Sequence, residues 1–278
     1  MACRGTRRFR GITMVEVVVV LVVLGMLAAM GVVKLLQMRS AGRRALCMKR
    51  QAELAFSVRR FEAEHGHFPG YVNRLSQQGV GGHRACSWVV TAFPYLGQAE
   101  LWSAWQGGAS FSPLLPALLC PEDLAKRNEP EGPLSFVANC GHAERPNLES
   151  CGVFHDHNLV SGKRLTTLDY LQRHDGAAAT LMLSENLQAG FWTDTAREDV
   201  GMVWFGVPGP SSNINQGREV GPRARDLQYA RPSSHHPGGV NAVYCDGHGQ
   251  FLSEKIDYEV FQRLMAPDDR GAGLDSAS

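Results

Sequence analysis

The chain has 278 residues, 44% of them hydrophobic, and its 28 basic side chains stand against 27 acidic ones. A formal charge of +1 gives no reason to expect nucleic acid or an acidic partner for the chain as a whole. The part after the first sixty residues is long enough for one sizeable domain with its own core. Charge is uneven only at the start, where the first ten residues hold four arginines and no acid.

An apolar run follows this basic leader. From Ile12 to Val33 it has 22 residues, and Glu16 is the only charged one. A helix of that length rises about 33 Å, enough to cross a hydrocarbon core of about 30 Å. A plain membrane anchor and a removed secretory signal are both open alternatives. The plain anchor leaves Glu16 unexplained, because an unpaired acid deep in lipid is costly.

The leader ends in Gly11, and Glu16 is the fifth residue after it. This pattern resembles the class III signal of type IV pilins and type II secretion pseudopilins. The resemblance implies that prepilin peptidase cuts after Gly11, that the new amine of Ile12 is methylated, and that the apolar segment stays as a helical stem. It also implies that Glu16 neutralises the N-terminal ammonium of a neighbouring subunit during assembly. The family usually has phenylalanine where this chain has Ile12.

The basic residues do not decide how the span is oriented. Lys34, Arg39, Arg43 and Arg44 follow it almost as densely as the leader arginines precede it. The resemblance implies a cytoplasmic leader and a C-terminal domain outside the cytoplasm. We therefore expect a single-pass protein of the inner (cytoplasmic) membrane, in contact with lipid, or a component of a pilus or of the cell surface.

The helix is expected to continue behind the span. Residues 12–64 contain no proline, and Gly66 and Pro69 are typical of a helix end. Apolar residues recur at spacings of three and four, which predicts one helix of about 50 residues. Two helices with a break near Gly42 are the alternative. The recurring residues are Ala41, Ala45, Met48, Ala52 and Ala55, then Leu54, Val58 and Phe61.

The remainder indicates an α+β domain. Two apolar strands flank Asp246-Gly247 within residues 240–252, and this dipeptide favours the positive φ angles of a tight hairpin. The predicted fold is pilin-like, a long N-terminal α-helix packed on a mainly antiparallel β-sheet. Other predicted elements are strands beginning at 86 and within 179–186 and 200–207, helices at 97–105 and 257–265, and a loop at 111–123. The predicted division is leader 1–11, transmembrane stem 12–33, soluble half of the helix 34–66, globular domain 67–265 and disordered tail 266–278.

His236 is followed by nine residues and then by Asp246-Gly247. This is similar to the signature of the prepilin-type H-x9-D-G protein family, and other stretches agree with that family in order along the chain. The resemblance implies a membrane-anchored, pilin-like exported protein whose C-terminal domain has no defined activity. The stretches are "RRALCMKRQAELAFSVRRFEAEHGHFPG", "SWVVTAFPYLGQAELW", "LLCPED", "SFVANCG" and "TLMLSENLQAGFW".

Histidines suggest chemistry only weakly. His236 with Asp246 would act as a metal ligand or a general base if the two side chains met, but the strand between them is expected to separate them. The simpler interpretation is that Asp246-Gly247 makes a turn and His236 packs in a loop. His155 and His157 would share one face of an extended segment, yet no third metal ligand is evident and a solvated loop is favoured. We expect no metal and no cofactor.

Cysteine usage fits a compartment outside the cytoplasm. Seven cysteines become six if the leader with Cys3 is removed, and six permit three disulfides among fifteen pairings. The absence of C-x-x-C argues against a zinc ribbon. Proximity along the chain favours a bridge between Cys140 and Cys151.

These observations favour a structural role and not an enzyme. The expected protein is a prepilin or pseudopilin-like subunit that assembles with like subunits or other pilin-like proteins. A tethered module that binds a glycan or an envelope component is the first alternative, and the aromatic residues of "FWTD", "VGMVWFGV" and "SAW" are its candidates, although core packing also explains them. A hydrolase using His236 and Asp246 is the second.

Overall fold

The computed structural model describes residues 14–77, 82–217 and 226–274. The chain divides into two compact units, Met1–Arg43 and Arg44–Ser278. One helix, α1 (Met14–His65), begins in the first unit and ends in the second, and it has no break at Gly42. Gly66 follows it with a φ of 77°, and its N–H donates to Glu62 O at 2.7 Å. The predictions of one long helix and of a glycine cap are confirmed.

Within the second unit, α1 buries one face. The buried residues recur at helical spacing, as expected of an amphipathic helix. The predicted stripe is partly wrong, because Ala41 and Ala45 are exposed and burial begins at a cysteine. The buried residues of this face are Cys47, Gln51, Leu54, Ala55, Ser57 and Val58.

A five-stranded sheet of order β5-β3-β4-β6-β7 forms the centre of the second unit. Every neighbouring pair is antiparallel except β3 with β5, so the expected mainly antiparallel sheet is confirmed. Its strands are β3 (Phe136–His142), β4 (Leu181–Glu185), β5 (Gly201–Trp204), β6 (Gly239–Tyr244) and β7 (Gly249–Ser253).

Helices cover both faces of this sheet. Phe136 pairs with Glu185, so their side chains share one face, whereas Asn139 lies three residues further along β3 and points to the other. On the first face, the Cys47 thiol of α1 donates to Glu185 at 2.8 Å. On the second, the Asn139 amide donates to the carbonyl of Met265 at 2.7 Å, the last residue of α6 (Tyr258–Met265). The sheet is therefore a middle layer between α1 and α6, which explains why β3, β4 and β6 are buried along their whole length.

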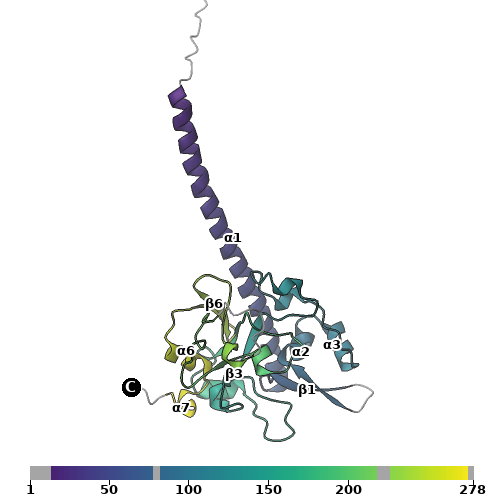
Figure 1. Cartoon of the computed structure of the whole chain (residues 1–278). Helices are drawn as coiled ribbons and strands as arrows, with labels where there is room; N and C mark the ends of the chain where they lie inside the picture. Colours follow the sequence, from purple (N-terminus) through teal and green to yellow (C-terminus); the bar gives the residue numbers. More distant parts are fainter. Residues whose placement is uncertain (1–13, 78–81, 218–225, 275–278) are drawn as a thin grey trace, which may run out of the picture. The chain divides into compact units, whose positions relative to one another are not determined.

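Smaller elements surround the sheet. In Figure 1, α6 and α7 (Asp269–Ala272) lie at one side of the second unit, and β1, α2 and α3 lie at the opposite side. A separate antiparallel hairpin, β1 (Val72–Ser76) with β2 (His83–Ser87), leads into α2 (Trp88–Ala92) and α3 (Ala99–Gln106). The remaining helices are α4 (Leu168–Arg173) and α5 (Arg197–Val200), with 3-10 turns at Phe93–Tyr95, Pro116–Leu118, Lys126–Asn128, Glu149–Cys151 and Leu227–Tyr229.

Most local predictions are confirmed, with three differences. The strand expected to begin at residue 86 ends at Ser87, because the next five residues form the buried helix α2. The last β6–β7 pair before the turn is Val243 with Gly249, so the connection is longer than a two-residue turn, and only Gly247 in it has positive φ, at 95°. The tail is not wholly disordered: the Asp268 side chain accepts from Gly271 N, Gly273 is left-handed at φ 81°, and these two caps bound α7.

Candidate functional site

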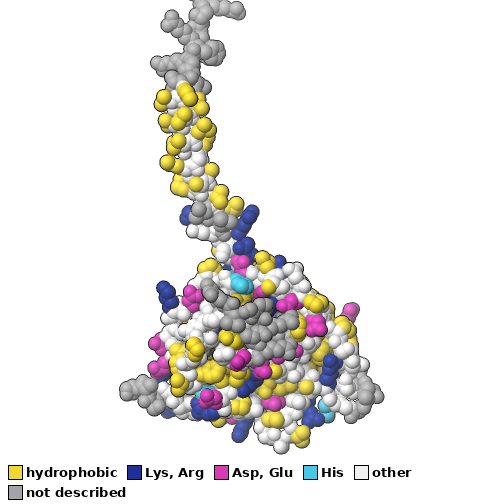
Figure 2. All heavy atoms as spheres, viewed as in Figure 1, with side chains coloured by type: hydrophobic (Ala, Val, Ile, Leu, Met, Phe, Trp, Pro, Cys, Tyr) yellow, Lys and Arg dark blue, Asp and Glu magenta, His cyan; other side chains and the backbone are white. Residues whose placement is uncertain are grey.

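The first candidate site is the apolar stem in the first unit. Every described side chain from Met14 to Val32 is exposed, and Figure 2 shows hydrophobic side chains along the visible face of the stem. By length and composition α1 is able to cross a membrane, with a mean hydropathy of 2.7 over its most apolar window. Glu16 lies in the first turn of the helix. The expected cleavage site, Gly11 and Ile12, lies outside the described residues.

The second candidate site begins with the histidine and aspartate of the H-x9-D-G motif, which the structure does not bring together. His236 precedes β6 and Asp246 follows it, so the two residues lie at opposite ends of that strand. The Asp246 carboxylate accepts from Nδ1 of His248 at 2.6 Å and from its backbone N–H at 3.0 Å. The interpretation of Asp246-Gly247 as a turn is confirmed.

His236 belongs to a different group of side chains, which we call the cysteine–histidine cluster: Cys47, Cys120, Glu185 and His236. One sulfur, oxygen or nitrogen atom from each lies within 4.8 Å of the others. His236 Nε2 lies 3.4 Å from Cys120 Sγ and 3.2 Å from Glu185 Oε1. The Cys47 thiol donates to the same Oε1 at 2.8 Å.

Four separate segments position these side chains. Cys47 lies on the buried face of α1, and Glu185 is the last residue of β4. Cys120 follows the 3-10 turn Pro116–Leu118, and His236 lies in the loop before β6. The backbone N–H of Asn241 donates to Glu185 Oε2 at 2.7 Å, which turns the other carboxylate oxygen toward the cluster.

The cluster is buried, and its surroundings shift the pKa values of its members in different directions. Exposure is 0% for Cys47 and His236, 2% for Glu185 and 4% for Cys120. Burial opposes a charged imidazole, but hydrogen bonds to Cys120 and Glu185 raise the pKa of His236 to about 10. The neighbouring Cys47 and His236 lower the pKa of the Cys120 thiol, whereas burial raises that of Cys47. These contacts therefore ease deprotonation of Cys120 and oppose deprotonation of His236.

Three kinds of chemistry are open to such a group: proton exchange among its members, a disulfide between the two cysteines, and binding of a soft cation. Nucleophilic attack on a substrate is disfavoured, because Cys120 and His236 are buried. His236 Nδ1 is also buried and has no hydrogen-bond partner in the described part of the chain.

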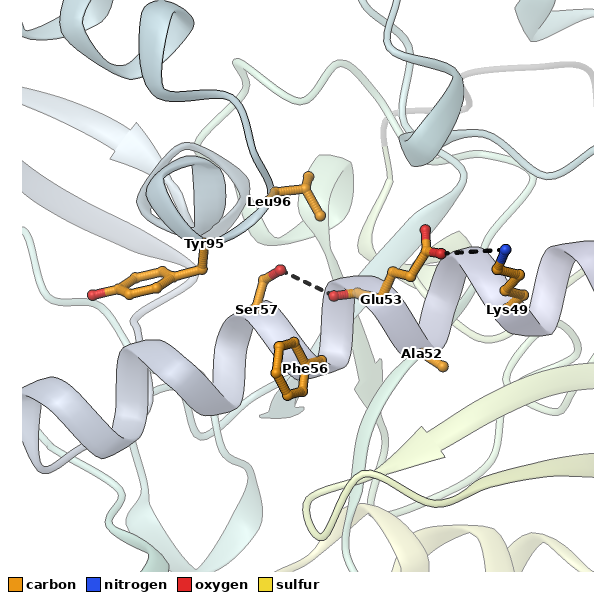
Figure 3. Close-up of a pocket in the computed structure, with 7 residues that line it drawn as sticks. All are labelled: Lys49, Ala52, Glu53, Phe56, Ser57, Tyr95 and Leu96. Atoms are coloured by element: carbon orange, nitrogen blue, oxygen red, sulfur yellow. Dashed lines mark hydrogen bonds and ion pairs between the residues drawn. The ribbon is translucent and has the colours of Figure 1, made fainter.

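A shallow groove on the second unit is the third candidate site. It has a volume of about 440 Å³ and lies between the exposed side of α1 and the turn that holds Tyr95 and Leu96. Figure 3 shows the Phe56 ring on this side of α1 and the ion pair of Lys49 with Glu53, 3.8 Å long, along it. The two hydroxyls in its lining are already engaged, because that of Ser57 donates to the Glu53 carbonyl at 3.0 Å and that of Tyr95 donates to Glu64 at 2.7 Å. The groove shares no residue with the cysteine–histidine cluster.

The predicted disulfide between Cys140 and Cys151 is absent from the structure, where both are free buried thiols. The Cys140 sulfur packs against Gly201 of β5. The Cys151 sulfur lies 3.9 Å from the Ser150 hydroxyl, in the 3-10 turn Glu149–Cys151. Proximity along the chain misled here, because the two side chains face different neighbours.

The expected solvated loop at His155 and His157 is also wrong. His155 is 1% exposed, and burial lowers its pKa to about 3. His157 is 5% exposed, and its Nε2 contacts the carbonyl of Arg164 at 2.8 Å. Burial lowers the pKa of His157 to about 4. Both rings are therefore neutral parts of the core at neutral pH.

The aromatic residues considered for a binding module are largely core. Trp105, Trp192 and Trp204 are each at most 1% exposed, and Phe191 is 8% exposed. The indole N–H of Trp192 donates to the Pro113 carbonyl, and that of Trp204 donates to the Cys151 carbonyl. Packing explains these side chains without a ligand.

Sequence reasoning missed Cys47, Cys120 and Glu185 as members of one site. No local spacing links them, because each comes from a different segment. A signal was nevertheless present: the stretches that agree with the H-x9-D-G family, "RRALCMKRQ", "LLCPED" and "TLMLSEN", contain one of them each. The structure brings these stretches and His236 to one point.

Comparison with known protein families gives two matches. Residues 37–259 match a family described as "Protein of unknown function (DUF1559)". Residues 6–32 match the "Prokaryotic N-terminal methylation motif". No curated protein and no solved structure matches the chain. The first match spans most of the second unit and includes all four residues of the cysteine–histidine cluster, and the second includes Gly11, Ile12 and Glu16.

Proposed function

This chain belongs to the DUF1559 family and is a prepilin-like protein anchored by a single membrane pass, and from this premise we propose that it is a structural subunit of a pilus or of a type II secretion-like assembly. Prepilin peptidase would cut it after Gly11 and methylate Ile12. The domain that follows the stem would lie outside the inner membrane, and the stem would join it to like subunits or to other pilin-like proteins.

The observation that carries the proposal is the position of Glu16 inside the methylation motif. The motif covers residues 6–32, and Glu16 follows Gly11 by five residues. It is the only acid between Met14 and Arg44. A buried carboxylate is costly alone but much less so when it is paired. The ammonium created at Ile12 of a neighbouring, processed subunit supplies a partner at the same depth in the membrane.

The apolar stem supports the same proposal. Its described side chains are exposed on all sides from Met14 to Val32, so no single face is reserved for the protein's own core. Such a surface is stable against lipid or against other apolar stems. An anchor alone needs the apolar length, whereas an assembling stem needs the length and a pairing charge.

The positions of the two motif residues argue against the alternative of a His/Asp hydrolase. The motif residues His236 and Asp246 lie at opposite ends of β6, and His236 is buried. A His/Asp hydrolase needs the two side chains to meet at a surface that a substrate reaches.

The test compares three variants of the full chain in the membrane of a cell that contains prepilin peptidase. Gly11→Val is expected to leave the chain uncut. Glu16→Gln is expected to be cut and methylated normally but to lose the ladder of crosslinked multimers that wild type forms. Glu53→Gln, an exposed acid further along α1, is the matched control and should behave as wild type.

Intact mass and N-terminal sequencing report the cut, and crosslinking in membranes reports assembly. A wild-type chain that begins at Met1 would contradict processing. A start beyond Ala28 would mean that the stem is removed, and multimers of equal abundance in Glu16→Gln would contradict the role of the acid.

A further inference from the structure

We propose that the cysteine–histidine cluster is a structural metal site that binds one zinc-class divalent ion through Cys47 Sγ, Cys120 Sγ, Glu185 Oε1 and His236 Nε2. This inference goes beyond the proposed assembly role and does not depend on it.

The donor set is the first argument. Two sulfurs, one imidazole nitrogen and one carboxylate oxygen are ligands of zinc and of related borderline-soft ions. Calcium and magnesium prefer shells of oxygen only, and two sulfurs exclude them. No other group of described residues offers a comparable set of ligands, and the four remaining described cysteines, at 86, 140, 151 and 245, are outside it.

Geometry is the second argument. The four donor atoms lie within 4.8 Å of one another, although they come from four segments. Metal–ligand bonds of about 2.0–2.3 Å place the corners of a tetrahedral shell roughly 3.3–3.8 Å apart. The observed distances of 3.4 Å from Cys120 to His236 and 3.2 Å from His236 to Glu185 are close to those values. The 2.8 Å contact from Cys47 to Glu185 would lengthen as the thiol proton gives way to the metal.

Orientation of the carboxylate is the third argument. Oε2 of Glu185 is already held by the backbone N–H of Asn241 at 2.7 Å, so Oε1 alone faces the two sulfurs and the imidazole. A partner of this kind outside the ligand shell fixes the direction of a metal-binding carboxylate.

Burial identifies the kind of site. All four ligands are at most 4% exposed, and together they fill four coordination positions. A site with four protein ligands and no open position is structural, whereas a catalytic site keeps a position for water or substrate. The bound ion would join α1 to the end of β4 and to the segments that precede β3 and β6, so it would hold these parts of the second unit together around Cys47.

The opposing interpretation is a disulfide between Cys47 and Cys120, which an oxidising compartment would permit. A disulfide would use two of the four side chains and would leave Glu185 and His236 as a buried pair without a further role. The metal uses all four, and for this reason we favour it.

The test uses the full chain purified in detergent under reducing conditions, incubated with Zn²⁺ and freed of unbound metal. We expect one zinc per chain by elemental analysis, and with Co²⁺ the ultraviolet absorption band of thiolate-to-cobalt charge transfer. Cys120→Ser and His236→Gln should each lose most of the bound metal. Cys245→Ser, a buried cysteine outside the cluster, is the matched control and should retain it.

Because a cluster variant is at risk of misfolding, the cobalt spectrum of the wild-type protein is the independent measurement. No thiolate band and no zinc on folded, reduced wild type would overturn the proposal. So would equal metal content in His236→Gln and wild type. Protein isolated from its native membrane with a peptide linking Cys47 to Cys120, and a mass lower by two hydrogens, would replace the metal site by a disulfide.

Discussion

Glu185 Oε1 lies 3.2 Å from His236 Nε2, so the histidine of the H-x9-D-G motif contacts the glutamate that ends β4 and not the motif's own aspartate. The aspartate serves the turn between β6 and β7, where it contacts His248. Two functions are therefore combined in one stretch of sequence. The motif histidine completes a buried polar cluster at one end of β6, and the Asp-Gly pair closes a hairpin at the other.

Zinc is expected to raise the melting temperature of the reduced protein. A ligand at 100 times its Kd stabilises the folded state by about 2.7 kcal/mol, which corresponds to about 5–10 °C for a domain of this size. The rise should depend on zinc concentration and should disappear with excess chelator. Differential scanning fluorimetry of wild type and His236→Gln checks this. An equal shift in the variant would mean that zinc acts elsewhere on the chain.

Gly239 is expected to tolerate no side chain. A Cβ at this position would lie 1.9 Å from the carbonyl oxygen of Leu252 on β7, and a backbone atom cannot move aside without separating the two strands. Gly239→Ala should therefore lower the free energy of unfolding by about 1–3 kcal/mol. Gly42→Ala, in an exposed part of α1 with open space around it, should instead raise stability by up to about 1 kcal/mol. Urea unfolding measures the change in the free energy of unfolding of each variant, which should be a loss for Gly239→Ala and a gain for Gly42→Ala. No change in Gly239→Ala would show that the two strands adjust to the added methyl group.

The sequence predicts the elements that depend on neighbouring residues better than those that depend on contacts between distant segments. The hairpin around Asp246-Gly247 and helix α6 are set by neighbouring residues, and both were predicted within one or two positions. Strand β2 ends earlier than its β-branched continuation suggests, because Val89 and Val90 are buried in α2. Tertiary packing of these two valines therefore outweighs the preference of β-branched residues for strands.

The cysteine–histidine cluster could not be predicted by the same means. Its members lie on α1, after a 3-10 turn, at the end of β4 and before β6, so only the tertiary fold brings them together. For the same reason the burial of His155 was not evident from its polar neighbours Asp156 and Asn158. Chain proximity predicted a Cys140–Cys151 bridge, whereas both thiols are free in the structure.

The segment that carries Cys120 depends on a buried lysine. Lys126 is 1% exposed, donates to the carbonyls of Leu134 and Asn186 at 2.6 and 3.0 Å, and pairs with Asp123 at 3.7 Å. Lys126→Met would leave a buried carboxylate and two carbonyls without this donor, and we expect a loss of about 3–5 kcal/mol. Lys49→Met, which removes an exposed ion pair, should change stability by less than about 1 kcal/mol. Chemical denaturation measures the free energy of unfolding of both variants. Similar losses in Lys126→Met and Lys49→Met would show that the burial of Lys126 adds nothing to stability.

The stability of the second unit is expected to fall on mild acidification because of His155. Burial, followed by the nearby His157 and Arg164, lowers its pKa in the folded chain to about 3, against 6.5 when it is unfolded. Below pH 6.5 the imidazole of His155 is therefore protonated in the unfolded chain but remains neutral in the folded chain. The stability that is present above pH 6.5 is lost as the pH falls toward 3, and the loss from this residue reaches about 2 kcal/mol at pH 5.

His155→Gln removes this titratable group, so the difference from wild type measures the contribution of His155 to the loss of stability in acid. Urea midpoints measured at pH 7 and pH 5 should fall less in this variant than in wild type, even if the variant is less stable at pH 7. His157 remains and lowers stability in the same direction, since burial depresses its pKa to about 4. His65→Gln, at the exposed end of α1, is the matched control and should show the wild-type fall. An identical fall in His155→Gln would mean that other groups account for the acid sensitivity.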